Sequence, residues 1–412
     1  MTTRPTPCPA LPQTPHPPVL RLRDPAGVVA AVPYLLGFVP RRSLVVVGVD
    51  EGQGVGATLR VDLPTDDLLG AGACEVLPVA WAHVGRVLRR NGCGRALVVL
   101  YGDVDPADLP DEAVRRLLDV LETPAVSRSD HDEDHDPDHD HRDDADHDPG
   151  GVLVLDVLLV GPCRFRSLLC PDRACCPVEG VLVSASGSHP VAASFVLAGR
   201  SVVGGREEVE PLPPVAEEAD RVAAATAAQR SCRAMPHGAA AADHDRRLLR
   251  EWVACLPGGP SPRLVGRLAS RWRANPLLRD ACLAVFLPGG PDLARHLLAG
   301  ANPPAPSLAG SLVDPGCAGA VHTGAPVLRR MAALVPAPLS AEVLAAHAWL
   351  SWASGEGTAA MVLAERALVV APTHSLARLV LQCLDHGLGA PWTAGPARTA
   401  AGGSPRRRAT GP

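Results

Sequence analysis

Strand-length runs of valine and leucine lie in the first half of this chain, and they constrain its fold more than any other feature. The runs cover residues 43–50, 95–103 and 151–161. Continuous apolar runs of this length are typical of strands that are covered on both faces of a sheet. Residues 57–63 instead alternate apolar and polar side chains. This alternation predicts a further strand, joined to the first by a glycine-rich hairpin.

Helical patterns fill the gaps between these runs. The other elements that we predict in this half are helices at 65–90, 106–121 and 192–198 and a short strand at 180–184. Thr65 is a suitable N-cap for the first helix, and Pro106 suits the first turn of the second. Alternating strands and helices are typical of layered α/β folds. We therefore expect residues 19–210 to form an α/β domain with a mixed or mostly parallel sheet and flanking helices.

The chain changes character at about residue 216, where helical runs separated by Pro and Gly replace the strand patterns. We expect residues 216–395 to form an α-helical domain. Residues 341–374 are similar to one tetratricopeptide repeat (TPR), with Gly355 at the turn between its two helices. An ordinary helical bundle remains the alternative, because repeat arrays usually need three repeats for stability.

Three polar segments interrupt or flank these domains. We expect residues 1–18, 127–150 and 396–412 to be disordered, because they cannot bury enough apolar surface. Residues 127–148 hold eleven acidic residues, two arginines and five histidines. Such a tract either binds metal ions loosely or is a solvated insertion in a surface loop, and we prefer the second interpretation.

The absence of lysine excludes several classes of enzyme. All 39 basic residues are arginine, so the chain lacks the phosphate-binding lysine of P-loop proteins and kinases and the Schiff-base lysine of pyridoxal enzymes. No apolar run is long enough to span a membrane, and the N-terminal segment lacks the apolar core of a secretion signal. We therefore expect a cytoplasmic protein, not bound to a membrane, with thiols rather than disulfides.

The stretch CRFRSLLCPDRACCPVEG, residues 163–180, combines four cysteines with three arginines. One interpretation is a zinc site, although we expect the adjacent Cys175 and Cys176 to point in different directions and a histidine such as His189 to be needed. A second is a redox pair between Cys170 and Cys175 or Cys176. A third is a turn whose cysteines pack against the sheet. We prefer the third and assign no metal ligands.

Polar side chains lie near the ends of the predicted strands. In open α/β sheets, ligands bind beyond the carboxyl ends of the strands, which here lie at Asp50, at 101–103 and at 162–166. If the strands are parallel, these groups face one crevice. Arg42 precedes the first strand and would join only if its loop folds back. The candidate ligand-binding residues are Arg164, Arg166, Tyr101, Asp103, Arg42 and Arg206, and their guanidinium groups suit a small anionic ligand.

Several segments of the chain occur in the order found in a known family. They are LRLRDPAGVVAAVPYLLGFVPRRSLVVVGVD, VDLP, VVLYGD, CRFRSLLCPDRACCPVEG, GRSVVGGREEVE and PTHSLARLVLQCLDHGLGAPW. Together they resemble the actinobacterial domain-of-unknown-function family 4192 (DUF4192), and the resemblance runs from about Val19 to Trp392. The resemblance implies an intracellular actinobacterial protein and brings no established activity with it. The His/Asp-rich tract looks like an insertion peculiar to this sequence.

These observations favour a non-enzymatic protein that binds a small anionic ligand through its α/β domain, or a protein partner through its helical domain. The alternative is an enzyme with Cys170 or Cys176 as nucleophile or redox thiol, its pKa lowered by nearby arginines, and with Arg164 or Arg166 stabilising an anion. Nucleic acid is not favoured, because the net charge outside the acidic tract is only +4 and aromatic residues make up 3% of the chain. No residue pattern identifies a cofactor.

Overall fold

The computed structural model describes residues 24–50, 52, 54–63, 71–122, 151–183, 187–287, 289–300 and 323–390, with 71–76 described for the backbone only. It consists of two compact units, Met1–Gly204 and Gly205–Pro412. The three segments predicted to be disordered, 1–18, 127–150 and 396–412, lie outside the described residues, as does the predicted helix start at 65–70.

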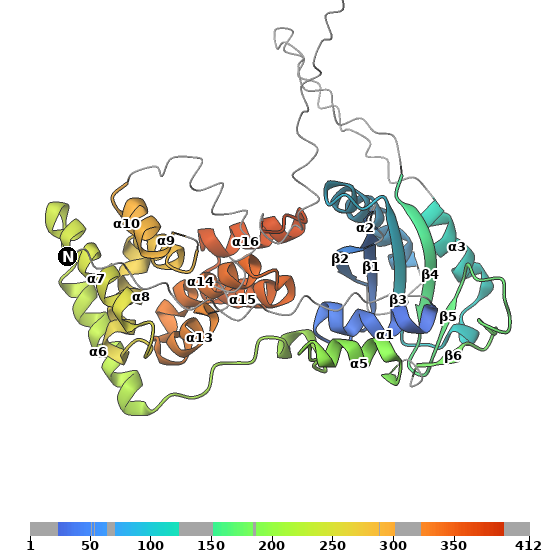
Figure 1. Ribbon diagram of the computed structural model, residues 1–412, viewed down its shortest axis with the longest axis horizontal. Helices are drawn as coiled ribbons and strands as arrows, with labels where there is room; N and C mark the ends of the chain where they lie inside the picture. The colour runs from blue at the N-terminus through green and yellow to red at the C-terminus, as the bar shows by residue number, and fades with distance from the viewer. Residues whose placement is uncertain are drawn as a thin grey trace, which may run out of the picture. The chain divides into compact units, whose positions relative to one another are not determined.

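The first unit is an α/β unit built on a six-stranded sheet (Figure 1). Its elements are α1 (Pro25–Leu36), β1 (Ser43–Val49), β2 (Val55–Asp62), α2 (Ala71–Arg90), β3 (Arg95–Tyr101), the 3-10 helix η1 (Pro106–Asp108), α3 (Asp111–Glu122), β4 (Leu153–Val160), β5 (Arg164–Ser167), β6 (Val181–Leu182) and α5 (Pro190–Leu197). The strand order is β2-β1-β3-β4-β5-β6.

The sheet is mixed, which is one of the two predicted alternatives, and it is not mostly parallel. β3 and β4 are parallel, while β1 is antiparallel to both β2 and β3, and β5 is antiparallel to β4 and β6. The predicted hairpin between β1 and β2 is confirmed. The predicted crevice requires parallel strands, and β1 is antiparallel to both of its neighbours.

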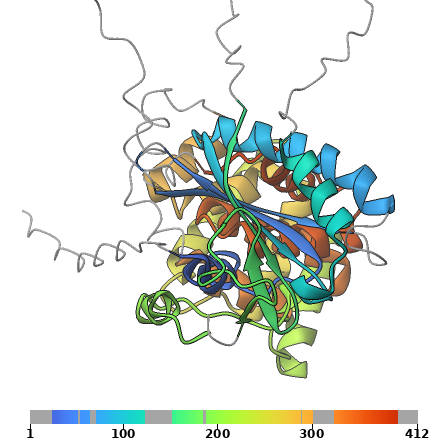
Figure 2. The same ribbon diagram turned by 90° about the vertical axis from the view of Figure 1, so that its right-hand side faces the viewer.

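Helices cover both faces of the sheet and make three layers (Figure 2). Leu44, Val98 and Leu159 point to the face that packs on α2 and α3. Their neighbours along the strands, such as Val45 and Val99, are also fully buried, on the opposite face, which α1 and α5 cover (Figure 2). Burial on both faces explains why the runs that form β1, β3 and β4 are continuously apolar.

Helix α1 is an element that the strand and helix patterns do not predict. Its N-cap Asp24 accepts a hydrogen bond from the backbone N–H of Gly27, and Gly37 ends the helix in the left-handed conformation. Tyr34 on α1 stacks on Phe195 of α5, with ring centroids 5.2 Å apart. The pair of helices therefore forms one layer against the sheet.

The regular elements of the second unit are all helices among its described residues (Figure 1). Its elements are η2 (Arg206–Glu208), α6 (Glu218–Arg233), α7 (Gly238–Cys255), α8 (Pro262–Ala274), α9 (Pro276–Ala284), α10 (Gly290–Leu298), α13 (Gly324–Leu334), η3 (Ala337–Leu339), α14 (Ser340–Ala353), α15 (Gly357–Val370) and α16 (Ser375–Asp385). One core runs from α6 to α16, and Trp252 packs edge-to-face against Trp272 and Phe286 in it.

Helices α14 and α15 form an antiparallel hairpin where the sequence resembles a TPR. Gly355 has φ +80° in the turn between them, a conformation that favours glycine. Small side chains such as Ala346 and Ala360 are fully buried, which lets the helices pack closely. No helix among the described residues is long and apolar enough to cross a membrane.

Candidate functional site

The amino end of β1 and the carboxyl end of β3 lie side by side at the same end of the sheet. Because the two strands are antiparallel, Ser43 at the start of β1 pairs with Tyr101 at the end of β3. Arg42 just before β1 donates from Nε to the carboxylate of Asp103. Because β1 begins at this end of the sheet, Arg42 lies here beside Asp103. Asp50, which follows β1, lies at the opposite end of the sheet.

Tyr101 is a core residue. Its side chain is buried, and its hydroxyl oxygen has no hydrogen-bond partner among the described residues. Burial raises the pKa of this phenol far above its usual value. The pairing of Val160 with both Tyr101 and Phe165 puts these three side chains on one face of the sheet. Arg164 and Arg166 lie on the other face, so the expectation of one crevice shared with Tyr101 is wrong.

The two arginines of β5 bind the loop that follows their own strand. Residues 168–180 connect β5 to β6, and we call them the cysteine loop. Arg164 Nη1 donates to the carbonyl of Gly180 at 2.6 Å, and Arg166 Nη1 donates to that of Val178 at 3.3 Å. Both guanidinium groups therefore hold the returning end of the loop.

Arg206 belongs to the helical unit. Its guanidinium pairs with Glu365 on α15 at 2.6 Å. Arg366, the next residue of α15, donates to the carbonyls of Glu207 and Glu210. The ion pair of Arg206 is therefore part of the attachment of η2 to α15 within this unit.

The cysteine loop is fixed at its first turn by side-chain hydrogen bonds. The hydroxyl of Ser167, the last residue of β5, donates to Asp156 Oδ1 on β4 at 2.6 Å and accepts from the backbone N–H of Cys170 at 2.9 Å. Further along, the N–H of Cys176 donates to the carbonyl of Asp172 at 2.8 Å. This last bond closes a helical turn.

Three thiols converge on this turn. The sulfurs of Cys170, Cys175 and Cys176 all lie within 4.8 Å of one another, and those of Cys175 and Cys176 are 3.8 Å apart. The expectation that the adjacent pair points in different directions is wrong. Neighbouring side chains diverge by about 100° in a helical turn, compared with about 180° in a strand. Cys163 is exposed and is not in this group.

The environment of Cys176 does not activate its thiol. Burial raises its pKa to about 12, and the neighbouring thiols of Cys170 and Cys175 also raise it, while a hydrogen bond from the Ser167 backbone N–H lowers it. The expected lowering by nearby arginines is not found at this residue. A thiol with so high a pKa carries little thiolate at neutral pH and is a weak nucleophile.

His189 does not join the thiols. It is the N-cap of α5, where its Nδ1 accepts from the N–H of Val191 at 3.2 Å. Its Nε2 lies 3.4 Å from the carboxylate of Asp24 at the start of α1. Both ring nitrogens are therefore engaged at the ends of the α1 and α5 helices.

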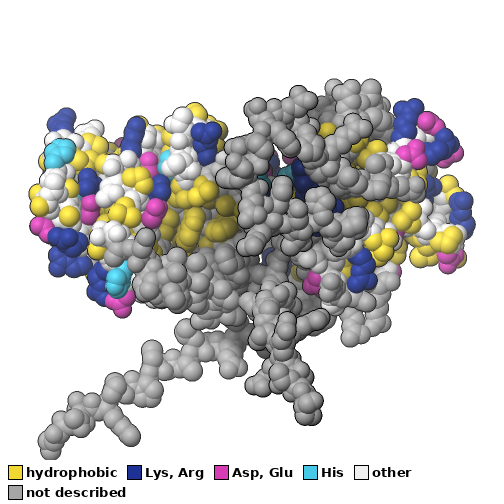
Figure 3. Space-filling view, turned by 90° about the horizontal axis from the view of Figure 1, so that it is seen from above, with side chains coloured by type: hydrophobic (Ala, Val, Ile, Leu, Met, Phe, Trp, Pro, Cys, Tyr) yellow, Lys and Arg dark blue, Asp and Glu magenta, His cyan; other side chains and the backbone are white. Residues whose placement is uncertain are grey.

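The helical unit holds a cavity that is not predicted from the sequence pattern. It lies between α7 and α10 and has a volume of about 600 Å³. Its lining residues are Asp243, Arg246, Arg247, Leu249, Arg250, Val253, Ala254, Pro291, Arg295, Leu298 and Ala299, and we call it the basic groove. Figure 3 shows arginine side chains interspersed with apolar ones over the described surface of this unit.

Two of the groove arginines pair with carboxylates on their own helices. Arg246 pairs with Asp243, and Arg295 with Asp292. Arg247 and Arg250 form no ion pair with any carboxylate in the part of the chain that the structure describes. The segment DHDRRLLR carries a signal for this face, because its arginines and leucines separate on a helix.

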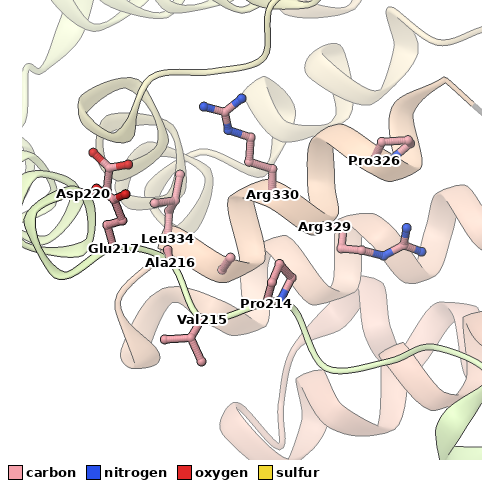
Figure 4. Close-up of a pocket in the computed structure, with 10 residues that line it drawn as sticks. Pro214, Val215, Ala216, Glu217, Asp220, Pro326, Arg329, Arg330 and Leu334 are labelled. Carbon is pink, nitrogen blue, oxygen red and sulfur yellow. The ribbon is translucent and has the colours of Figure 1, made fainter.

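A shallower pocket of about 330 Å³ lies between α13 and the segment that leads into α6 (Figure 4). Arg330 lines it together with the carboxylates of Glu217 and Asp220. Arg329 points to the other side in Figure 4, where it donates two hydrogen bonds to Glu210. Its mixed charge makes this pocket less suited to an anion than the basic groove.

Comparison with known proteins gives a family and no relative of known activity. No curated protein and no solved structure matches the chain. The family described as "Domain of unknown function (DUF4192)" matches residues 25–390. This match covers both units, including α1, the cysteine loop and the basic groove. The chain therefore belongs to the DUF4192 family.

Proposed function

We propose that this chain is a non-enzymatic binding protein whose helical unit takes an acidic segment of a partner protein into the basic groove. The observation that carries the proposal is the lining of the groove, in which four guanidinium groups surround an apolar floor with a single carboxylate, that of Asp243. The small-anion site expected in the α/β unit has less support, because Arg164 and Arg166 already donate to backbone carbonyls.

The charge of the groove supports an anionic occupant. Arg247 and Arg250 are exposed on α7, one helical turn apart, and have no described carboxylate partner. A guanidinium group that no protein acceptor occupies is free to bind a carboxylate with two parallel hydrogen bonds. The excess of positive charge also attracts an acidic segment before contact is made.

The floor of the groove supports a polypeptide occupant over a small inorganic anion. Leu249 and Leu298 come from facing helices, and Val253 lies one turn after Leu249. A groove of about 600 Å³ with this floor accommodates several apolar side chains. The combination favours an amphipathic segment whose apolar face lies on the leucines and whose acidic face meets the arginines.

The helical hairpin of α14 and α15 agrees with an interaction role. We propose that it is TPR-like, which its left-handed Gly355 and its buried alanines support. We also propose a cytoplasmic, actinobacterial setting. The nine cysteines that the structure describes fully are all free thiols, which supports a reducing compartment.

The enzyme alternative has weaker support from the geometry. It needs Cys170 or Cys176 as a thiolate, yet burial keeps the pKa of Cys176 at about 12. It also needs an arginine that is free to bind an anion, and both arginines of β5 bind the cysteine loop instead.

Fluorescence anisotropy of labelled peptides tests the proposed function on the full chain. The probe is an amphipathic peptide with glutamates on one helical face and leucines on the other, and the comparison peptide replaces each Glu with Gln. A single-stranded oligonucleotide forms a third arm. We expect the acidic peptide to bind at least about tenfold more tightly than the Gln peptide, because at least two new carboxylate pairs form.

Variants of the groove give the matched controls. Arg247→Glu with Arg250→Glu lowers the affinity for the acidic peptide by about tenfold or more, and the two Gln substitutions lower it by less. The control carries Arg230→Glu and Arg378→Glu, two exposed arginines of the same unit outside the groove. An equal loss in the control, equal binding of both peptides, or preference for the oligonucleotide would overturn the proposal.

A further inference from the structure

We infer that Cys170, Cys175 and Cys176 bind one thiophilic metal ion, with Zn²⁺ as the ion of choice. Zinc–thiolate bonds are about 2.3 Å long, so two sulfurs on one tetrahedral ion lie about 3.8 Å apart. The sulfurs of Cys175 and Cys176 are 3.8 Å apart, and all three lie within 4.8 Å of one another. Movements of less than about 1 Å bring the third sulfur to the same spacing. This site is independent of the basic groove and of the function proposed for it.

The loop holds the three thiols in place before any ion arrives. Ser167 fixes the backbone of Cys170, and the N–H of Cys176 is bound to the carbonyl of Asp172. The Asp172 side chain also accepts from the N–H of Ala174 at 2.8 Å, which tightens the same turn. Arg164 anchors the far end at Gly180. Such preorganisation reduces the entropy that is lost on binding.

The surroundings suit thiolate ligands on a metal. Burial raises the pKa of the Cys176 thiol and the backbone N–H of Ser167 acts to lower it, and hydrogen-bond donors commonly surround metal–thiolate sites. Three thiolates and one divalent ion together carry a net charge of −1. Arg164 and Arg166 bind the carbonyls of the same loop and bring positive charge to it. Each thiol that binds the ion releases its proton to solvent.

The geometry favours a metal ion over a disulfide. A disulfide joins only two sulfurs, whereas three converge here, and the closest pair is 3.8 Å apart, the spacing expected on a tetrahedral ion. Cys175 is exposed, which gives the ion an entry path from solvent. Neither His189 nor Cys163 supplies a fourth ligand, because His189 caps α5 and Cys163 is outside the group. A water molecule or an external ligand completes the coordination.

Cobalt(II) titration of the reduced full chain tests the site. Tetrahedral cobalt bound by thiolates has a sulfur-to-metal charge-transfer band in the near ultraviolet, which His and Asp ligands do not give. The His/Asp-rich residues 127–148 therefore cannot imitate the signal. We expect a charge-transfer band that saturates at one ion per chain and is removed by an equivalent of Zn²⁺, which binds thiolates more tightly.

Single substitutions separate the three ligands from other cysteines. Cys175→Ser is the main variant, because Cys175 is exposed and its replacement leaves the core intact. We expect this variant to lose about 100-fold or more in cobalt affinity and part of the charge-transfer band. Cys163→Ser, an exposed cysteine of the same stretch, keeps both. The inference is overturned if the full chain gives no charge-transfer band, if Cys175→Ser leaves the band unchanged, or if Cys163→Ser reduces it equally.

Discussion

Two pairs of arginines, one pair in each unit, differ in what they are bound to. In the α/β unit, Arg164 and Arg166 donate to backbone carbonyls of the cysteine loop. In the helical unit, Arg247 and Arg250 line an open groove and have no carboxylate partner among the described residues. Each of these bonds uses one of the five donors of its arginine and directs the guanidinium group onto the cysteine loop, whereas no described hydrogen bond fixes the guanidinium groups of Arg247 and Arg250. In a chain whose 39 basic residues are all arginine, this distinction separates structural from binding roles.

The largest expected effect on stability comes from replacing Arg271, whose guanidinium group is buried in an ion pair. Arg271 on α8 and Asp245 on α7 form a buried pair with hydrogen bonds of 2.6 and 2.8 Å. Arg271→Met leaves the Asp245 carboxylate buried without its charged partner, and only the hydrogen bond from Asn275 Nδ2 remains. We expect the free energy of unfolding of the helical unit to fall by about 3–5 kcal/mol. Urea titration followed by tryptophan fluorescence measures this, because Trp252 and Trp272 lie in the same core.

The control for this prediction is Arg267→Met on the same helix. Arg267 pairs with Glu251, but both side chains are about one-third exposed or more. We expect a loss of at most about 1 kcal/mol. Equal losses for the two substitutions would mean that burial of the pair does not govern the role of an arginine in this unit.

A buried histidine beside the Arg329–Glu210 pair makes the helical unit sensitive to acid. His347 on α14 is buried, and burial lowers its pKa to about 4, with Arg329 also lowering it and Glu210 opposing the change. In the unfolded chain a histidine titrates near 6.5. Between these values the unfolded state binds more protons, so the free energy of unfolding falls as pH drops from about 7 to 4, by up to about 3 kcal/mol.

Comparison of variants isolates this contribution. In His347→Gln the loss of stability between pH 7 and pH 4.5 becomes smaller, whatever its stability at pH 7. His296→Gln, at an exposed histidine of α10, keeps the loss seen in the unsubstituted chain. The same pH dependence in all three proteins, measured by urea titration at each pH, would exclude His347 as its source.

Arg164 gives an intermediate effect. Arg164→Met removes the 2.6 Å hydrogen bond to Gly180 and with it one anchor of the cysteine loop. We expect the α/β unit to lose about 1–2 kcal/mol and cobalt binding to weaken, while peptide binding stays unchanged. Arg173→Met, at an exposed arginine of the same loop, is expected to change neither stability nor cobalt binding. Loss of peptide affinity in Arg164→Met would contradict a structural role.

Arg42 gives the smallest expected effect on stability. Its ion pair with Asp103 is about half exposed, so Arg42→Ala costs at most about 1 kcal/mol from the lost pair. Arg42 also has φ +42°, a left-handed backbone that costs residues other than glycine about 1–2 kcal/mol. We therefore expect Arg42→Gly to be more stable than Arg42→Ala, by about 1 kcal/mol in thermal unfolding. The reverse order would show that this conformation carries no strain.

The sequence predicts those elements that its hydrophobic periodicity defines. The apolar runs of β1, β3 and β4, the hairpin to β2 and the turn at Gly355 all have local signals, and the structure confirms them. Strand direction has no such signal. The ion pair between Arg42 and Asp103 depends on the antiparallel direction of β1. For this reason it could not be derived from the sequence pattern alone.

The sequence pattern does not predict strand β5, helix α1 or the convergence of the three thiols, because in each case the local pattern is weak or ambiguous. The alternation of Arg and Phe in β5 is a strand pattern, but its four residues lie within a cysteine-rich stretch. The helix α1 has Pro33 in its interior and apolar residues on all sides, so it lacks the amphipathic period. The convergence of three thiols depends on one helical turn between Asp172 and Cys176, which neighbouring loop residues fix.

The central claim is that the groove arginines without protein partners serve binding, whereas the engaged arginines hold the fold. Peptide affinity and thermal unfolding, measured on the same samples of Arg247→Glu with Arg250→Glu, test it most directly. We expect the affinity for the acidic peptide to fall about tenfold or more, while the free energy of unfolding changes by no more than about 0.5 kcal/mol. Unchanged affinity, or a loss of stability that accounts for the loss of binding, would contradict the claim.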